Sequence, residues 1–337
     1  MKKLKFIDKL IFFVNSLVAF LLLVSYILPY IPPKSFSLLS VLSLAVPILI
    51  VLNILFFLYW LLNAKKQLMI SLVVLVIGFN YITSIYKFTG SKTVEDTSNF
   101  SVMNYNVRLF NVFNWLPSKT VEADILKFVK SESPSIISFQ EYRKSENFTL
   151  EGYEKFEYVF GDKVKSGQAI FSKFPIVNSG SIAFPNTSNN AIFVDVVKQK
   201  DTVRIYNLHL QSSKVSTKVS ELQKEGSEQL TKRIGEVFKM QQTQAELVLK
   251  HRDKCPYKTI ITGDFNNTAY SYIYDKIKGD FQDAFKVAGN GFGKTFDFNI
   301  IPLRIDFILV DDAFTVNGFK NYDVKLSDHY PIKAVLK

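Results

Sequence analysis

Three stretches without a charged residue dominate the start of this chain. They run from Leu10 to Pro33, from Ser35 to Ala64 and from Gln67 to Tyr86. Each is about as long as the roughly 20 apolar residues that a helix needs to cross the hydrocarbon core of a bilayer. None shows the polar stripe of a helix that packs on a soluble core. The sequence therefore predicts a membrane anchor with three transmembrane helices, at about residues 10–30, 36–63 and 67–86.

A secretory signal peptide is the main alternative for the first stretch, because three lysines stand among the first five residues. The apolar run is long for a signal peptide, however, and it ends in Leu28–Tyr30 rather than in small residues that a signal peptidase would accept. A signal peptide would also leave the two later stretches unexplained. Buried helices of a soluble core are the second alternative.

The basic residues predict how the anchor is oriented. Residues 1–92 carry nine lysines and one acidic residue, and the net charge of the whole chain is +11, so residues 93–337 contribute only +3. Lysines precede the first stretch, Lys65 and Lys66 follow the second, and only Lys34 lies between the first two. The positive-inside rule then places the N-terminus in the cytoplasm and, after three crossings, residues 93–337 on the extracytoplasmic side. The basic excess thus indicates a membrane before it indicates nucleic acid.

Residues 93–337 have the pattern of a folded domain with many short strands. Apolar runs rich in Val, Ile, Phe and Tyr alternate with charged residues, and two amphipathic segments, 120–129 and 236–250, predict helices. This pattern predicts an α/β or α+β sandwich of two packed sheets with helices outside. The single Cys255 and the three histidines of the chain exclude a disulfide framework, a cysteine-based zinc cluster and a multi-histidine metal site. The predicted strands are Ser101–Val107, Ile136–Phe139, Ala169–Ser172, Ala191–Val197, Val203–Leu210, Thr259–Thr262, Ile305–Val310 and Ile332–Leu336.

Polar side chains stand at the ends of these predicted strands, where apolar residues would be expected. A buried carboxylate usually has a partner or a metal, and open sheets commonly place ligand sites at strand ends. Each of these residues taken singly also fits a turn, a cap or a core histidine, so the argument rests on the whole set. The candidates are Asn106, Glu141, His209, Asp264, Asn266, Asp306, Asp328 and His329.

The candidates lie in seven sequence blocks that follow one another in a fixed order. The blocks are Asn-Tyr-Asn-Val, Ser-Phe-Gln-Glu, Gly-Gln-Ala-Ile-Phe-Ser, Asn-Leu-His-Leu-Gln-Ser, Gly-Asp-Phe-Asn, Arg-Ile-Asp-Phe-Ile and Ser-Asp-His-Tyr-Pro. This ordered set resembles the endonuclease/exonuclease/phosphatase superfamily of metal-dependent phosphoesterases, which includes deoxyribonucleases, abasic-site endonucleases, sphingomyelinases and inositol-polyphosphate 5-phosphatases. The resemblance begins at about Ser101 and runs to the end of the chain. It implies a four-layer sandwich of two mixed sheets flanked by helices.

The resemblance also implies a metal site and a catalytic base. Glu141 would be the direct carboxylate ligand of Mg²⁺ or Mn²⁺, with Asn106 completing or supporting the site and Asp328 acting as a ligand directly or through water. Oxygen ligands suit such hard cations. Asp264 would position or deprotonate the attacking water, and Asn266 would hold a phosphate oxygen.

Two imidazoles complete the implied site. His329, oriented by Asp306, would contact the phosphate, and His209 would be a second phosphate-contacting group or the acid for the leaving group. These residue types suit phosphodiester hydrolysis, which requires neutralised oxygens, an activated water and a protonated leaving group. A carboxylate beside an imidazole raises its pKa and keeps it protonated near neutral pH.

The sequence thus predicts a membrane-tethered, divalent-metal-dependent phosphodiester hydrolase with a nuclease-like site. Its predicted partners are a phosphodiester, as nucleic acid or phospholipid headgroup, and the lipid bilayer; no protein partner is inferred. The alternatives are a phospholipid or inositol-phosphate hydrolase acting at the membrane surface, and a non-catalytic membrane binding module. A charge of +3 gives residues 93–337 no large basic face for duplex DNA.

Two local features stay open at this point. The lysine-rich residues 211–235 predict a solvated helix or loop, with a mobile flap over an anionic substrate as the alternative. The aromatic residues Phe110, Phe113 and Trp115 follow Asn106 closely and are expected to pack in the core, although they would also be placed to flank a cleft.

Overall fold

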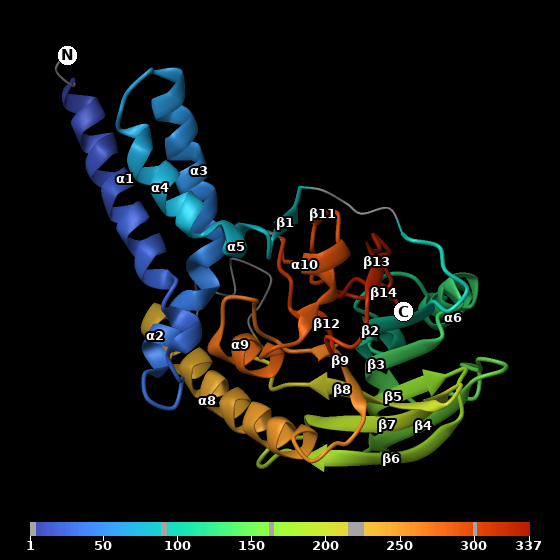
Figure 1. Ribbon diagram of the computed structural model, residues 1–337. Coiled ribbons are helices and arrows are strands. Elements are labelled where there is room, and N and C mark those ends of the chain that lie inside the picture. Colours follow the sequence, from blue (N-terminus) through green and yellow to red (C-terminus); the bar gives the residue numbers. More distant parts are fainter. Residues whose placement is uncertain (1–4, 89–92, 162–164, 215–225, 299–301) are drawn as a thin grey trace.

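The computed structural model describes residues 5–88, 93–161, 165–214, 226–298 and 302–337. A bundle of N-terminal helices rises from one side of a larger α/β domain (Figure 1). Its long helices are α1 (Phe6–Ser25), α3 (Val46–Leu62) and α4 (Leu68–Ile77), followed by the short α5 (Phe79–Ile82). The connection from α1 to α3 lies beside the domain and contains η1 (Leu28–Tyr30), α2 (Ser37–Val41) and η2 (Leu42–Ala45).

Two of the three predicted transmembrane helices have the required length. The segments Phe6–Tyr30 and Ser37–Leu62 are long and apolar enough to cross a membrane, with mean hydropathies of 2.5 and 2.8. The predicted third span is wrong among the described residues, because α4 has only ten residues and ends at Gly78. Ten helical residues rise about 15 Å, which is half of a hydrocarbon core. The Tyr26 side chain packs so closely on Gly78 that a Cβ there would lie 1.8 Å from its hydroxyl oxygen.

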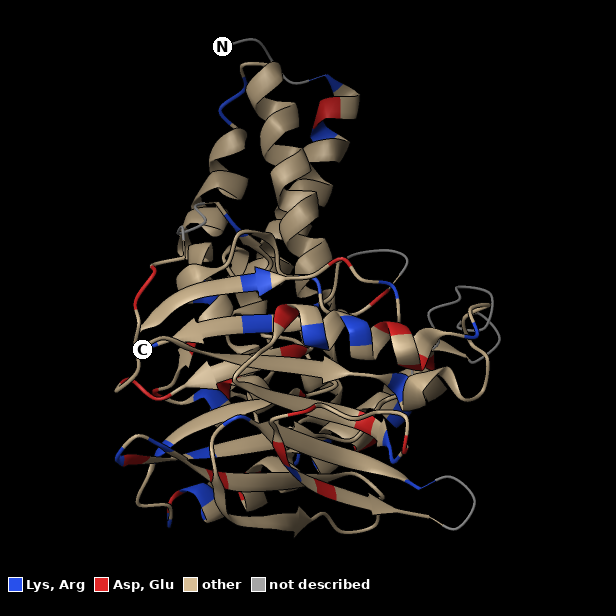
Figure 2. Ribbon diagram, turned by 90° about the vertical axis from the view of Figure 1, so that its right-hand side faces the viewer, with Lys and Arg blue, Asp and Glu red and all other residues tan. Residues whose placement is uncertain are grey.

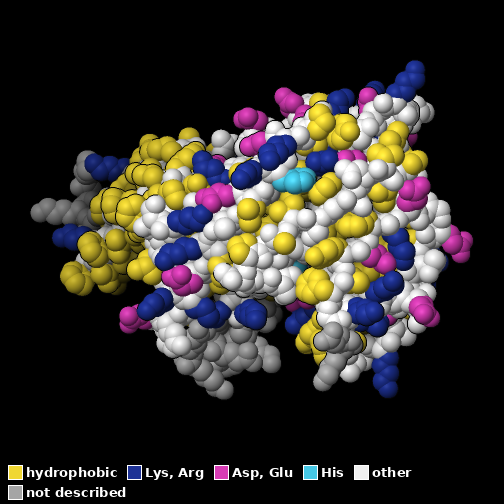
Figure 3. Space-filling model, turned by 90° about the horizontal axis from the view of Figure 1, so that it is seen from below, with side chains coloured by type: hydrophobic (Ala, Val, Ile, Leu, Met, Phe, Trp, Pro, Cys, Tyr) yellow, Lys and Arg dark blue, Asp and Glu magenta, His cyan; other side chains and the backbone are white. Residues whose placement is uncertain are grey.

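The bundle buries several polar side chains beside its apolar core and exposes many apolar side chains on its outer surface. Asn15 on α1 donates to Ser71 on α4 over 2.7 Å and accepts from the indole of Trp60 on α3 over 2.9 Å, and all three residues are buried. Phe13 and Leu17 on α1 are 67% and 49% exposed. Figure 3 shows apolar side chains gathered over these helices, whereas charged side chains are scattered over the domain.

The charged end of the bundle points away from the domain. The hydroxyl of Tyr59 near the end of α3 donates to Asp8 near the start of α1 over 3.1 Å, so these two helix ends lie together. Lysines flank this end, both at the start of α1 and in the turn that contains Lys65 and Lys66, as Figure 2 shows. The N-terminus and that turn therefore lie on one side, and α2 and the domain lie on the other (Figure 1).

The domain contains two mixed six-stranded sheets, as expected. One has the order β13-β14-β2-β3-β5-β4, with β2 (Phe100–Asn106), β3 (Ile136–Arg143), β4 (Glu154–Phe160), β5 (Ser166–Ser172), β13 (Val316–Asn321) and β14 (Ile332–Leu336). The other has the order β10-β12-β9-β8-β7-β6, with β6 (Ile176–Ala183), β7 (Asn190–Lys198), β8 (Asp201–His209), β9 (Lys258–Asp264), β10 (Gln282–Asp283) and β12 (Asp306–Val310). All eight predicted strands are confirmed. Sequence analysis missed the four edge strands β4, β6, β10 and β13. No residue of β4 or β6 is buried, so their apolar pattern is weak, and β10 has only two residues.

Helices cover the outer faces of the two sheets. The inner faces pack on each other through Val and Ile side chains of β2, β7, β8 and β9. Helix α6 (Val121–Glu132) packs on the first sheet, and α8 (Ser227–Arg252) and α9 (Tyr272–Lys278) pack on the second. The short α10 (Ala284–Ala288) contacts β13, and β1 (Tyr86–Lys87) pairs with β11 (Gly291–Phe292). Both predicted helices are confirmed, but α8 begins earlier than predicted, at Ser227. The residues 211–235, expected to form a solvated helix or loop, are therefore partly helical, and residues 215–225 lie outside the described residues.

Candidate active site

The pairing of the strands brings the predicted residues to one edge of the sandwich. Strands β2 and β3 are parallel, as are β8 and β9, so their carboxyl ends lie at the same edge. Strands β14 and β12 run antiparallel to β2 and β9, so their amino ends meet those carboxyl ends. In the ladder of the second sheet, Asp264 is paired with His209 on one side and with Asp306 on the other.

Asp264 lies at the centre of the site. Its Oδ2 accepts from the amide Nδ2 of Asn106 at 3.0 Å and from that of Asn266 at 3.1 Å, and its Oδ1 accepts from the backbone N–H of Asn266. The Nε2 atoms of His329 and His209 lie 3.7 Å and 3.9 Å from the same Oδ2. Burial raises the pKa of the Asp264 carboxyl, and the neighbouring His329 only partly offsets this. The environment thus makes Asp264 a stronger base than an exposed aspartate.

His329 and Asp306 form the expected imidazole–carboxylate pair. The His329 Nδ1 lies 2.9 Å from the Asp306 Oδ2, and both side chains are buried. Burial by itself would lower the pKa of His329, but the charges of Asp306 and Asp264 outweigh it and raise that pKa to about 10. Asp306 is fixed in turn, because its backbone N–H donates to Thr295 Oγ1 and its carboxylate accepts from Asn104. The imidazolium therefore presents Nε2 to the site.

His209 has the opposite electrostatic character. Burial lowers its pKa, and the nearby Glu141 opposes this effect only in part. Its Nε2 lies 3.9 Å from Glu141 Oε1 and 3.9 Å from Asp264 Oδ2. The site thus holds two imidazoles of different charge at neutral pH, one on each side of Asp264.

Glu141 is directed into the site by an irregularity of its strand. The sequence places it after the end of a strand, but β3 continues to Arg143 and Glu141 lies inside it. The register with β5 shifts between Phe139 and Tyr142, and Glu141 has a φ of 46°, which is typical of a β-bulge. A bulge turns a side chain away from the alternation of its strand. The Glu141 Oε1 consequently lies 3.2 Å from the amide nitrogen of Asn106, and about a third of the side chain is exposed.

The donor set of this cluster fits a hard divalent cation. The Glu141 and Asp264 carboxylates converge on one amide of Asn106, and the exposed face of Glu141 leaves room for water ligands. Asp264, Asp306 and His329 also place one donor atom each within 4.8 Å of the others. Oxygen-rich sites with water positions suit Mg²⁺ or Mn²⁺. The Asn106 oxygen accepts from the backbone N–H of Arg108 at 3.1 Å, so Asn106 acts here as a support for the carboxylates.

Asp328 is engaged by a residue that sequence analysis missed. Its carboxylate lies 2.9 Å from the Arg108 guanidinium, which stacks over the ring of Trp115 with 4.4 Å to the centroid. Arg108 begins a run of four non-glycine residues with positive φ, from 41° to 61°, a conformation rare for such residues. Phe110 is buried as expected. Phe113 and Trp115 are 58% and 41% exposed, so the prediction that they pack in the core is wrong for both.

Buried amides and hydroxyls support the site from below. Gln140 donates to Asn104 on the neighbouring strand at 2.7 Å and to Asn207 of the other sheet at 2.5 Å. Thr262 also bonds across the sheets, donating to Ser138 at 2.7 Å. From α8, Gln241 donates to the carbonyls of residues 265 and 266 next to Asp264. The signal that could have revealed such a residue is the group of glutamines at positions 241, 242 and 244 in the predicted amphipathic helix 236–250, all of which are buried.

Both parts of the chain match known sequence families. The sequence profile of the endonuclease/exonuclease/phosphatase family matches residues 103–329, about two thirds of the chain. The chain belongs to this family. A second profile, which describes a domain of unknown function, matches residues 8–85. No curated protein matches the sequence.

Solved structures of the endonuclease/exonuclease/phosphatase fold match the domain. A family member from Bacteroides vulgatus is 20% identical with a TM-score of 0.55, and the match covers 71% of this chain and 98% of that one. The mannosyl-6-phosphatase of Bacteroides thetaiotaomicron is 20% identical with a TM-score of 0.53, covering 71% and 99%. The D. rerio protein TDP2, complexed with a single-stranded DNA product, is 15% identical with a TM-score of 0.53, covering 72% and 100%. These likenesses concern the fold.

Proposed function

We propose that the chain is a membrane-tethered, divalent-metal-dependent phosphodiester hydrolase. The observation that carries this proposal is the convergence of Glu141, Asp264 and His329 at one edge of the two sheets, with Asp264 3.7 Å from the His329 imidazole. A scaffold that served only for binding would have no need of this buried charge, because a buried charge is expensive unless it is paired. Membership of the family supports the same reaction class.

In the proposed mechanism, Asp264 orients the attacking water and accepts its proton. The raised pKa of its carboxyl suits a general base, because proton transfer is most effective from a group whose pKa lies near the working pH. The side-chain amide of Asn266 donates to Asp264 and to the carbonyl of Leu210, so it would contact a phosphate oxygen by releasing the Leu210 carbonyl. His329, charged and oriented by Asp306, would contact the same phosphate through Nε2.

His209 and the metal complete the proposed reaction. Neutral His209 would contact the phosphate through a ring N–H from the side opposite His329. It would pass a proton to the leaving oxygen only after taking up a proton itself, because only the imidazolium is acidic enough. Glu141 would hold Mg²⁺ or Mn²⁺ with Asn106 as its support, and Asp328 would stay near the ion through water. Such an ion neutralises phosphoryl oxygens and stabilises the charge of the leaving group.

We infer that residues 1–92 are the membrane anchor of a catalytic domain at residues 93–337. Polar side chains inside the bundle and apolar side chains outside are the arrangement expected of helices in lipid. The lysines at the end away from the domain support a cytoplasmic position for that end. The helices α4 and α5, although too short to cross a whole hydrocarbon core, lead the chain back from that end to the domain, so the domain would lie on the extracytoplasmic side.

The test is hydrolysis by the full chain in detergent micelles. We expect bis-p-nitrophenyl phosphate to be cleaved with Mg²⁺ or Mn²⁺, cleavage to stop with EDTA, and His329→Ala to lower the rate roughly 100-fold or more. His251→Ala is the matched control, because His251 lies on α8 and bonds Tyr206 rather than the site. Silence of the wild-type chain with both metals would contradict the proposal.

The substrate class needs a parallel comparison. One structural neighbour is a mannosyl-6-phosphatase and another holds a single-stranded DNA product, so p-nitrophenyl phosphate, single-stranded DNA, RNA and phospholipid vesicles belong in one panel. We expect diesters to be cleaved faster than the monoester. Preference for vesicles over nucleic acid would favour the phospholipid alternative.

A further inference from the structure

The N-terminal bundle contacts the loop that carries the proposed catalytic base. This loop leaves β9 at Asp264 and reaches Tyr270 six residues later. The Tyr270 hydroxyl donates to the backbone carbonyl of Tyr81 in α5 over 2.9 Å. Its ring stacks on that of Tyr81 at 5.8 Å, which stacks on Tyr26 at 4.7 Å. Tyr270 is 2% exposed, so it belongs to the packed core of the bundle rather than to a solvent-exposed loop.

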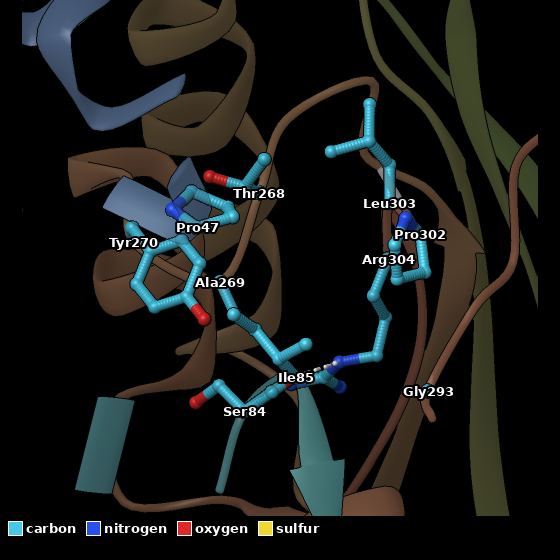
Figure 4. Close-up of a pocket in the computed structure, with 10 residues that line it drawn as sticks. All are labelled: Pro47, Ser84, Ile85, Thr268, Ala269, Tyr270, Gly293, Pro302, Leu303 and Arg304. Carbon is cyan, nitrogen blue, oxygen red and sulfur yellow. Dashed lines mark hydrogen bonds between the residues drawn. The ribbon is translucent and has the colours of Figure 1, made fainter. Parts of the chain in front are cut away.

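The end of the bundle also contacts the residues that lead into β12, the strand that begins with Asp306. Arg304 lies two residues before Asp306, and its Nε donates to the backbone carbonyl of Ser84 over 3.0 Å. Its Nη1 pairs with the buried Asp283 at 2.7 Å, which fixes the guanidinium. Figure 4 shows Tyr270 and Arg304 on opposite sides of a small cavity, with Ser84 and Ile85 between them. Residues 79–85 thus bridge the chain next to Asp264 and the chain next to Asp306.

A third contact reaches the site through α8. The backbone N–H of Lys34, in the connection between α1 and α3, donates to Gln242 over 2.9 Å. The adjacent Gln241 donates to the carbonyls of residues 265 and 266 and accepts from Asn267 at 2.8 Å. The loop between Asp264 and Tyr270 is thus connected to the bundle in two ways. Tyr270 bonds the bundle directly, and residues 265–267 bond α8, which in turn bonds the connection between α1 and α3.

We propose that the N-terminal bundle is a positioning element of the active site, and that Tyr270 and Arg304 are the positioning residues that connect the two. This inference rests on the proposed hydrolase function. Asp264, the proposed base, and Asp306, the partner of His329, each lie within six residues of a residue that is hydrogen-bonded to the bundle, Tyr270 or Arg304. Both bonds end on residues 81–84 of the bundle. Displacement of a catalytic group by about 1 Å can lower a rate roughly 100-fold, so the loss of one such bond affects turnover more than it affects folding.

The test is the Tyr270→Phe variant of the full chain in detergent micelles, with Tyr272→Phe as the matched control on α9. The variant removes only the hydroxyl that binds Tyr81 and keeps the ring stack. We expect kcat for bis-p-nitrophenyl phosphate to fall roughly tenfold while KM stays within about twofold. We also expect faster amide hydrogen exchange in residues 264–270, with exchange in β7 and β8 unchanged. Arg304→Lys should act in the same direction on exchange around Asp306.

Three outcomes would overturn the inference. Unchanged kcat and unchanged exchange in Tyr270→Phe would show that the hydroxyl positions nothing. A fall in kcat with faster exchange throughout the domain would show general destabilisation instead, as would an equal effect of Tyr272→Phe. If the wild-type chain hydrolyses nothing, the proposed function fails, and unchanged exchange at 264–270 in Tyr270→Phe would then overturn the positioning role by itself.

Discussion

The bundle and the domain of this protein distribute polar and apolar side chains in opposite ways. In the bundle, Asn15 and Ser71 meet inside and Leu17 faces outward. In the domain, residues such as Ile136 and Ile260 fill the space between the sheets, and few charged side chains are buried. A folded region exposes the side chains that its surroundings solvate, apolar ones in lipid and charged ones in water. This difference is the one expected if the bundle folds in lipid, as proposed, and the domain folds in water.

The buried polar groups of the two regions also differ in kind. The buried polar groups of the bundle are neutral amides, hydroxyls and an indole, which hydrogen-bond between helices. At the edge of the domain the buried groups are ionisable: Asp264, Asp306 and His329. Neutral hydrogen bonds serve association of helices. Buried charge is costly, and outside the site it is paired, as in Asp283 and Arg304, whereas at the edge of the domain two carboxylates and an imidazole share one cluster.

We expect the largest effect from a substitution in the domain that lowers the rate of hydrolysis and leaves the thermal stability unchanged. Glu141→Gln should lower metal-dependent hydrolysis more than 100-fold, because it removes the proposed anionic ligand of the cation. Its thermal midpoint without metal should stay close to that of the wild type, since the side chain is partly exposed. Glu146→Gln, on the exposed turn after β3, is the matched control and should change neither quantity. An active Glu141→Gln enzyme would remove Glu141 from the site.

The next effect compares outward-facing residues of the two regions. Leu17→Lys on α1 should reduce membrane integration, because a lysine near the middle of a span costs about 2.5–3.5 kcal/mol in insertion. Val177→Lys on β6, at 60% exposure, should be neutral within about 0.5 kcal/mol. Carbonate extraction of membranes measures the first, and thermal unfolding measures the second. Equal tolerance of both lysines would contradict a lipid-facing α1.

The smallest effect is a pH dependence of the metal-free domain. Its neighbours raise the pKa of folded His329 from 6.5 to about 10, so the charged imidazole stabilises the fold fully below about pH 6.5. That contribution is lost as the pH rises toward 10. Thermal midpoints in EDTA should therefore fall between pH 7 and 10 in the wild type and in a His251→Gln control, and less in His329→Gln. Parallel curves for wild type and His329→Gln would show that His329 is not held charged.

The sequence by itself determined much of the domain. Alternating strands predicted the sandwich, and the ordered blocks predicted the residues that meet at its edge. Periodicity and residue type suffice there, because most of the blocks lie at a strand end and the pairing of the strands brings those ends to one edge. Apolar length likewise revealed α1 and α3, but it overestimated α4, since composition carries no information on the packing of Tyr26 against Gly78.

Only the tertiary structure decided how the site is held. The bulge that directs Glu141, the Arg108–Asp328 pair and the Gln241 contacts join residues far apart in the chain or depend on strand register. The junction of Tyr81 with Tyr270, almost 190 residues apart, has no local signature either. The physical reason is that local patterns report which face of an element is buried, whereas the partner across that face is chosen only when the elements pack.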